Sequence, residues 1–366
     1  MAAVLEVLGL VSDVFGLVGF GQDALPQQNS KGSTIRVTVG LDVSGGLNNA
    51  GGDVPDIRLF NEAGGFLGMK ADPGKVSTGD FHDVTVPHES NTGQQATYTL
   101  FSANNDAICI AYSSITWASG DQYGWTGDWG KACGGTWYYS NIYISASGVM
   151  PNCTWIDANG DQPITGLQIH WPEFVNTDGT NGPGQANQKP MDYYCNSGPP
   201  FKMYTNKDPN SIVSWPAKTR RDDVDNDDDD DDDLSERQLP ATEIAYGPAK
   251  SVRSAKFRDE KLHRRNSTST STSKSRIASS LVVGDNDMHS AAGLCASETS
   301  YGPDLYHTRH GQFCRMSDKK LFPVCSATVT DNCFNSELMK LVINGVAARD
   351  EPYSNVIDWS GGIEKK

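Results

Sequence analysis

A run of seven consecutive aspartates, Asp227–Asp233, divides this chain of 366 residues into two halves. A tract this acidic cannot bury enough apolar surface to offset its chain entropy, so it is expected to lie outside the folded core. An even number of cysteines on each side predicts disulfide bonds that stay within each half. These are Cys109, Cys133, Cys153 and Cys195 before the tract, and Cys295, Cys314, Cys325 and Cys333 after it.

Free structural thiols and a zinc site are the alternatives to disulfides. Zinc ribbons and fingers need closely spaced C-x2-C pairs, and the shortest spacing here, Cys325 to Cys333, is wider. Four cysteines allow three pairings in each half, and the sequence does not choose among them. Asn152 and Asn266 each begin an Asn-x-Thr glycosylation triplet. Cysteines and triplets together predict an extracellular or cell-surface protein.

The acidic tract also accounts for most of the net charge. The chain carries a net charge of −15, and ten of its acidic residues lie between Asp222 and Asp233. The remaining sequence has no basic patch that would neutralise phosphates. We therefore expect no nucleic-acid partner.

Residues 1–31 form an apolar N-terminal segment that ends near Pro26. It lacks the basic start of a signal peptide, and Glu6 and Asp13 make it a poor transmembrane span. Drawn as a helix, these acids share one stripe with Gly9 and Gly16, which predicts an amphipathic helix. We expect it to pack on the next domain or to be an atypical leader. The alternative is self-association or membrane contact through residues 2–20.

Residues 32–205 alternate apolar and polar side chains in short runs separated by Gly, Asn, Asp and Pro. With no helical pattern between the runs, this predicts a mainly β domain, an antiparallel β-sandwich of jelly-roll type. The expected strands are Ile35–Val39, Asp56–Phe60, Phe81–Val86, Thr97–Phe101, Ala107–Tyr112, Trp137–Ile144, Leu167–Trp171 and Phe201–Tyr204.

Residues 206–280 are poor in apolar side chains, rich in segregated charge, and end in a Ser/Thr tract, which predicts a disordered linker. Dibasic pairs end at Arg221 and Arg265. Exposed pairs of this kind are accessible to processing proteases, and cutting after both would free residues 222–265. The alternative is a charged spacer that stays intact.

Apolar side chains become frequent again in residues 281–366, which predicts a small disulfide-containing C-terminal region. It either stands alone or lends strands to the first domain. Residues 337–346 fit a short helix, or else a strand that enters a turn at Asn344 and Gly345.

Aromatic residues are concentrated between Tyr112 and Tyr143, where nine of 32 residues are aromatic against 9% in the whole chain. The glycines around Trp125 and Trp129 predict a loop that presents both rings. Rings beside carboxylates suit a sugar, whose C–H face stacks while its hydroxyls form hydrogen bonds. The candidate ligand-binding residues are Tyr123, Trp125, Asp128 and Trp129. The alternative has Trp137 and Tyr139 in the core and Trp125 and Trp129 covering its rim.

Asp157, Asn159 and Asp161 have the spacing that begins a calcium loop. The match ends at Gln162 and Gln168, where such a loop has Gly and Glu. A turn in which Asx side chains bind their own backbone fits better. We expect no cofactor, with weak calcium binding as the alternative.

The familiar catalytic signatures G-x-S-x-G, H-E-x-x-H and a Gly-rich phosphate loop are absent from the sequence. Neither the His307 and His310 pair nor His82 has a third ligand or a nucleophile beside it in sequence. A glycosidase needs only two suitably spaced carboxylates. The candidates for such a pair are Asp121, Asp128, Asp157, Asp161 and Glu173.

Three stretches carry a resemblance to known sequences: Asp56–Glu62, Tyr123–Tyr139, and Ser300–Asp304 with the following Cys314. In these stretches the chain resembles uncharacterised secreted or surface proteins of filamentous ascomycete fungi. The resemblance implies an effector-like protein and a kexin-type protease acting at the dibasic pairs. It implies no catalytic activity.

These patterns favour a non-enzymatic effector, virulence or adhesive module that binds a glycan or a host or cell-wall protein through its aromatic β domain. One alternative is a membrane-acting toxin or cell-death protein that uses residues 2–20. A second is a carbohydrate-active hydrolase.

Overall fold

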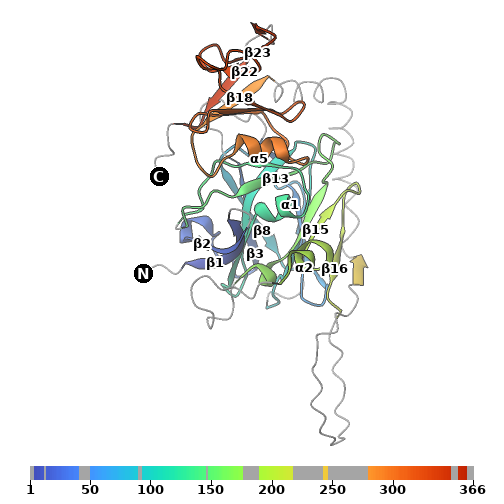
Figure 1. Ribbon diagram of the computed structural model, residues 1–366. Coiled ribbons are helices and arrows are strands. Elements are labelled where there is room, and N and C mark those ends of the chain that lie inside the picture. The colour runs from blue at the N-terminus through green and yellow to red at the C-terminus, as the bar shows by residue number, and fades with distance from the viewer. Residues whose placement is uncertain are drawn as a thin grey trace, which may run out of the picture.

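The chain folds into a mainly β protein with antiparallel sheets in its N-terminal half (Figure 1). The computed structural model describes residues 4–11, 14–40, 50–89, 93–145, 147–175, 189–216, 242–245, 279–347 and 353–360. The predicted fold class is thus confirmed at the level of mainly β structure. The expected strands 56–60 and 201–204 appear with the same bounds as β5 and β15.

The first sheet has six strands in the order β12-β13-β10-β3-β8, with β11 also pairing β10. All its pairs are antiparallel. Its strands are β3 (Gly32–Val39), β8 (Phe81–Pro87), β10 (Ile108–Thr116), β11 (Gln122–Thr126), β12 (Trp137–Tyr139) and β13 (Asn152–Ile156). The strand expected over 137–144 therefore ends at Tyr139.

The second sheet has five antiparallel strands in the order β15-β14-β9-β5-β6. They are β5 (Asp56–Phe60), β6 (Phe66–Lys70), β9 (Tyr98–Ser102), β14 (Gly166–His170) and β15 (Phe201–Tyr204). Ile35 and Val37 of the first sheet and Ile57 and Leu167 of the second belong to one buried hydrophobic cluster. The two sheets thus share a core, as the layers of a β-sandwich do.

Short elements connect these strands. They are β4 (Gly52–Asp53) with β7 (Lys75–Val76), the 3₁₀ turns η1 (Gln22–Ala24) and η2 (Trp171–Phe174), and the helices α1 (Asp128–Ala132) and α2 (Met191–Asn196). Strand β16 (Ser211–Ser214) pairs with β17 (Thr242–Ala245), although both lie in the segment expected to be disordered. Ile212 explains the order of β16, because its side chain is buried with Tyr98 and Leu100.

The N-terminal segment was predicted to be an amphipathic helix, and this prediction is wrong. Strands β1 (Leu5–Val11) and β2 (Val14–Phe20) pair along their whole length as an antiparallel hairpin. Valine and glycine have low helix propensity. The hairpin, in addition, buries apolar side chains of this segment in the core. Val7, Val18 and Phe20 are fully buried, with Val7 packed beside Gly124 of β11.

Four disulfide bonds form, two in each half as predicted. Cys109 of β10 joins Cys153 of β13, and α1 is tied to α2 through Cys133 and Cys195. In the C-terminal half, the pairs are Cys295–Cys314 and Cys325–Cys333.

The C-terminal region builds a sheet of its own, in the order β21-β20-β19-β18-β25, with β18 parallel to both neighbours. Figure 1 shows it at one end of the molecule, with α5 (Ala291–Ala296) on the side facing the sandwich. The strands are β18 (Ser280–Gly284), β19 (Asp304–His307), β20 (Gln312–Arg315), β21 (Lys320–Pro323) and β25 (Asn355–Asp358); β22 (Cys333–Asn335), β23 (Lys340–Ile343) and β24 (Val346–Ala347) form a smaller sheet.

Of the two alternatives for residues 337–346, the strand and turn is the one observed. Asn344 and Gly345 have φ angles of 55° and 71° between β23 and β24. A two-residue hairpin turn of this kind needs positive φ at both central positions, which Asn and Gly adopt most readily.

The hairpin gives a direct test of the N-terminal structure. Val7→Asp would bury a carboxylate in an apolar site, so we expect it to lower the free energy of unfolding by about 3 kcal/mol or more. Val4→Asp is the matched control because Val4 is 50% exposed, and it should change stability by no more than about 0.5 kcal/mol. Denaturant unfolding measures both; equal effects would contradict the buried hairpin.

Candidate functional site

Trp125 and Trp129 were expected to present their rings to solvent, and the structure corrects this. Both side chains are fully buried. Trp125 stacks on Phe201 with ring centroids 5.5 Å apart. Trp129 packs against Phe174, and its Nε1 donates to the carbonyl of Leu8 at 3.0 Å. Neither ring can stack on a ligand in this conformation, because each fills the core instead.

The two other residues of that group differ from each other. Asp128 is buried, and its Oδ1 accepts hydrogen bonds from the backbone N and Nδ2 of Asn152 at 2.9 and 2.6 Å. Burial raises the pKa of Asp128 to about 6, although these hydrogen bonds oppose the shift. Tyr123 is half-buried against Trp117. Tyr123 thus keeps a partly exposed ring, whereas Asp128 has a structural role in holding β13.

Asp157, Asn159 and Asp161, the candidate calcium ligands, lie in a turn of the kind expected from the sequence, in which Asx side chains bind nearby backbone N–H groups. Oδ2 of Asp157 accepts the backbone N–H of Asp161 at 2.7 Å, and Asn159 Oδ1 accepts the same N–H at 3.1 Å. Burial raises the pKa of Asp157 to about 6. Within the described ranges, no group of three or more His, Cys, Asp or Glu side chains is placed to hold a metal ion.

The glycosylation candidate Asn152 lies in β13, beside the disulfide at Cys153. Its Nδ2, the atom that would carry a glycan, donates to Asp128, and the hydroxyl of Thr154 donates to the carbonyl of Gly127. Asn266 and the processing candidates Arg221 and Arg265 lie outside the described residues.

Most remaining candidates for catalysis are used locally. Asp121 is exposed and accepts a hydrogen bond from Ser119. His82 contacts the carbonyl of Pro73, while the rings of His307 and His310 stack 3.9 Å apart. Glu173 is the exception, because it belongs to a group of titratable and aromatic side chains.

Strand register creates this group on the second sheet. Tyr98 of β9 lies opposite Phe60 of β5 on one side and His170 of β14 on the other. The residue after Asn61, Glu62, therefore lies beside His170. We call the resulting set the His170 cluster; it comprises Glu62, Tyr98, His170, Glu173, Tyr193 and Trp215.

His170 lies between two carboxylates. Its Nε2 is 2.8 Å from Oε2 of Glu62, and its Nδ1 is 3.5 Å from Oε1 of Glu173. The first contact is a hydrogen bond, whereas the second is too long for one and is an ion pair. The imidazole also stacks on Tyr98, with centroids 4.1 Å apart. The His170 side chain is 5% exposed, so both contacts act in a poorly solvated place.

The three groups adjust one another's protonation. Burial lowers the pKa of His170, but Glu173 and Glu62 more than offset it, so the net pKa is raised. Burial raises the pKa of each glutamate, but the interaction of each with His170 outweighs burial, so both pKa values are lowered. The cluster therefore favours the protonated imidazole and the ionised carboxylates over their neutral forms.

Two rings lie beside Glu173. Tyr193 Oη and Trp215 Nε1 both donate to its Oε1, at 2.8 and 3.3 Å. The planes of Tyr193 and Trp215 differ by 20°, their centroids are 5.8 Å apart, and both side chains are half-buried. The Glu62 side chain, on the other side of His170, is 61% exposed. Partly exposed rings and an exposed carboxylate thus occur in one cluster.

This arrangement suits binding better than acid catalysis. A glycosidase needs a carboxylic acid that stays protonated, with a raised pKa, to release the leaving group. Glu62 and Glu173 have lowered pKa values instead. The carboxyls with raised pKa values, Asp128 and Asp157, are buried and hold backbone N–H groups.

Sequence reasoning found only Glu173 of this cluster. One signal for His170 was present, since residues 167–171 alternate as Leu-Gln-Ile-His-Trp, which places Gln168 and His170 on the face opposite the main core. No sequence pattern places Tyr193 and Trp215 beside His170, because Tyr193 belongs to α2 and Trp215 directly follows β16.

Comparisons with known proteins do not indicate a function for this chain. No protein-family model matches this chain, and no curated protein shows significant sequence similarity to it. In the part of the chain that the structure describes, no helix is long and apolar enough to cross a bilayer.

The His170 cluster predicts a pH-dependent contribution to stability. A raised pKa stabilises the fold fully below the ordinary histidine value of 6.5, and this is lost as pH rises through the folded-state pKa. Lowered glutamate pKa values stabilise above 4.5, and this is lost as pH falls. We expect His170→Gln to cost more unfolding free energy near pH 5.5 than near pH 9, as measured by urea unfolding.

Comparing variant with parent cancels other groups that titrate in this range, including Asp128 and Asp157. The control is a Glu62→Gln/Glu173→Gln background, in which only the burial that lowers the pKa of His170 is left, so His170→Gln should no longer cost more near pH 5.5 than near pH 9. A pH-independent cost in the parent background would show that the imidazole is merely packed there.

Proposed function

We propose that this protein is a secreted or cell-surface glycan-binding module, a non-enzymatic effector or adhesive domain. The proposed contact residues are Tyr193, Trp215 and Glu62 of the His170 cluster. They replace Trp125 and Trp129, whose burial removes them from contact with a ligand.

The observation that carries the proposal is the half-buried ring pair beside an ordered carboxylate. Tyr193 and Trp215 lie nearly parallel, and Glu173 fixes both rings through their polar atoms. Such rings offer faces for the C–H side of a sugar, while the exposed Glu62 carboxylate can accept hydroxyl protons. Rings held in place before binding lose little side-chain entropy when the ligand arrives.

The disulfides support the proposed compartment. Every cysteine is paired within the structure, as expected in an oxidising environment. Processing after Arg221 and Arg265 by a kexin-type protease, and a host or cell-wall protein as the alternative ligand, remain part of the proposal.

The two alternative functions receive less support. A membrane-acting toxin would have to pull Val7, Val18 and Phe20 out of the sandwich core before residues 2–20 could insert. The carboxyls with raised pKa values among the described residues, Asp128 and Asp157, are buried and accept backbone N–H groups, which does not favour a role as the acid of a hydrolase.

The proposal is tested on an array of neutral cell-wall oligosaccharides. We expect the parent to bind a subset of them, and Trp215→Ala and Tyr193→Ala each to weaken that binding by about tenfold or more, the loss of roughly one stacking contact. Titration calorimetry with the best oligosaccharide gives the dissociation constants, and circular dichroism checks that each variant is folded.

The matched control is Phe81→Ala, which removes a 45% exposed ring from β8 of the other sheet and should leave binding unchanged. If the folded Trp215 and Tyr193 variants bind like the parent, the site is elsewhere. If the parent binds no oligosaccharide, glycan recognition is wrong and a protein ligand becomes the alternative to examine.

A further inference from the structure

The edge of the first sheet is occupied by the C-terminal half. Strand β12 is the last strand on that side, and its backbone continues into a parallel bridge between Trp137 and Ser300. The N–H of Trp137 donates to the carbonyl of Thr299 at 3.2 Å, and the N–H of Tyr301 donates to the carbonyl of Trp137 at 2.8 Å. An unpaired strand edge is therefore covered from within the same chain.

The polar atoms of four buried rings cross the same boundary. Trp137 Nε1 donates to Ser297 Oγ at 2.9 Å, and Trp155 Nε1 donates to the carbonyl of Tyr301 at 3.0 Å. Tyr138 donates to the carbonyl of Pro303 at 3.1 Å. Tyr139 Oη donates to the carbonyl of Ser290 and accepts the N–H of the same residue at 2.9 Å. Aromatic anchors with satisfied polar tips are typical of tight interfaces.

The two halves approach each other closely at Gly302, which lies against the ring of Tyr138. A Cβ placed there would lie 2.3 Å from Cδ2 of Tyr138, so only glycine fits against that ring. Trp359 and His289, also from the C-terminal half, pack on Tyr138 and Tyr139, with centroid distances of 6.3 and 4.6 Å.

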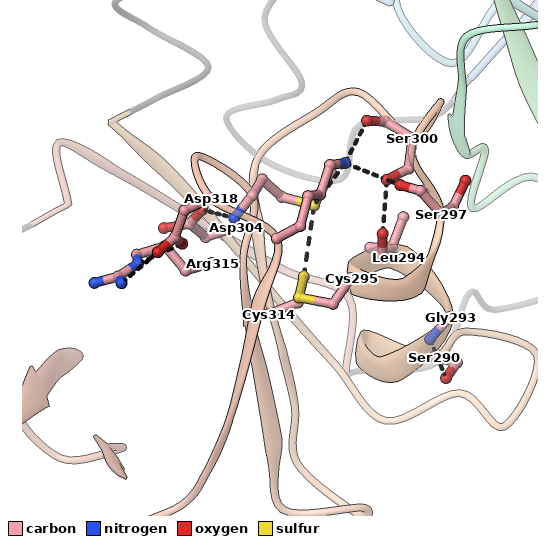
Figure 2. The surroundings of a disulfide bond; sticks show 12 residues. Ser290, Gly293, Leu294, Cys295, Ser297, Ser300, Asp304, Cys314, Arg315 and Asp318 are labelled. Atoms are coloured by element: carbon pink, nitrogen blue, oxygen red, sulfur yellow. Dashed lines mark hydrogen bonds and ion pairs between the residues drawn. A yellow bond between two sulfur atoms is a disulfide. The ribbon is translucent and has the colours of Figure 1, made fainter. Parts of the chain in front are cut away.

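The C-terminal half holds its side of this contact rigidly. Figure 2 shows the disulfide between Cys295 and Cys314, which ties α5 to β20 next to the interface loop. Ser300 Oγ donates to the carbonyl of Leu294 at 2.7 Å, and Lys319 Nζ donates to the carbonyl of Ser300. The loop is therefore shaped by its own half and needs little reordering to bind β12.

No covalent cross-link other than the connecting chain joins the two halves, since all eight cysteines pair within their own half. We infer that the interface formed by Trp137, Tyr138, Tyr139 and Trp155 binds the C-terminal half as a separate partner, so that a cut between the halves yields one two-chain particle. Processing at Arg221 and Arg265 then removes residues 222–265 without separating the halves. The inference does not depend on glycan binding.

The test uses the full chain with a recognition site for a sequence-specific protease inserted between Arg265 and Asn266, so that β17 stays on the same piece as its partner β16. After cutting, a non-reducing denaturing gel should show two pieces, whereas size-exclusion chromatography and native mass spectrometry should show one particle that persists on dilution to nanomolar concentration. Elution of the pieces as two separate species at micromolar concentration would overturn the inference.

Two variants test the interface itself. Gly302→Ala should raise the dissociation constant of the cut particle by about tenfold or more, because the buried Tyr138 ring cannot move aside. Its matched control is Gly284→Ala in β18, where the nearest atom to the new Cβ is 3.8 Å away. Tyr138→Phe keeps the ring and removes one hydrogen bond, so a rise of about threefold to tenfold is expected even if Gly302→Ala fails to fold. Parent-like affinity in both would contradict the assigned contacts.

Discussion

A tryptophan buried in a protein core must still find an acceptor for its indole N–H, and this requirement organises the molecule. Trp129 bonds to the N-terminal hairpin, Trp117 bonds to the carbonyl of Ala96, and Trp171 bonds to Thr99 within the second sheet. Trp137 and Trp155 bond to the C-terminal half. The rings therefore bury apolar area and also specify which distant segments must meet. Trp125 and Trp359 are exceptions, since the buried Nε1 of each has no hydrogen-bond partner in the described part of the chain.

The same packing explains why the candidate site lies on the outer face of the second sheet. Rings that point inward are buried in the core or against the C-terminal half. Most of the aromatic residues between Tyr112 and Tyr143 are therefore not accessible to a ligand. The register of β5, β9 and β14 places side chains on the opposite face, where Tyr98 and Ile212 form a small separate cluster. At the end of that cluster, Trp215 and Tyr193 stay half-exposed because the sheet stops there and Glu173 holds them.

Local patterns in the sequence predicted the features that depend on neighbouring residues. Alternation identified β5 and β15, the cysteine distribution restricted the disulfides to each half, and the Asn344-Gly345 pair fitted a hairpin turn. Features set by long-range packing were missed. The polar stripe in residues 5–20 suggests an amphipathic helix, whereas the burial of Val7 and Phe20 beside Gly124, which favours the hairpin, depends on distant residues. The His170 cluster was equally out of reach, because strand register and not spacing brings Glu62 to His170.

The position of Asn152 has a consequence for the order of events during biosynthesis. In the folded protein its amide nitrogen is engaged by Asp128, its neighbour Cys153 is bonded to Cys109, and the Thr154 hydroxyl is bonded to Gly127. A glycosylating enzyme needs all three residues in an open, extended chain. In a compartment with a glycosylating enzyme, sugar addition at this triplet and closure of β13 onto β10 would thus be competing reactions. The rate at which Cys109 and Cys153 form their disulfide would then set the fraction of molecules that carry a glycan at Asn152.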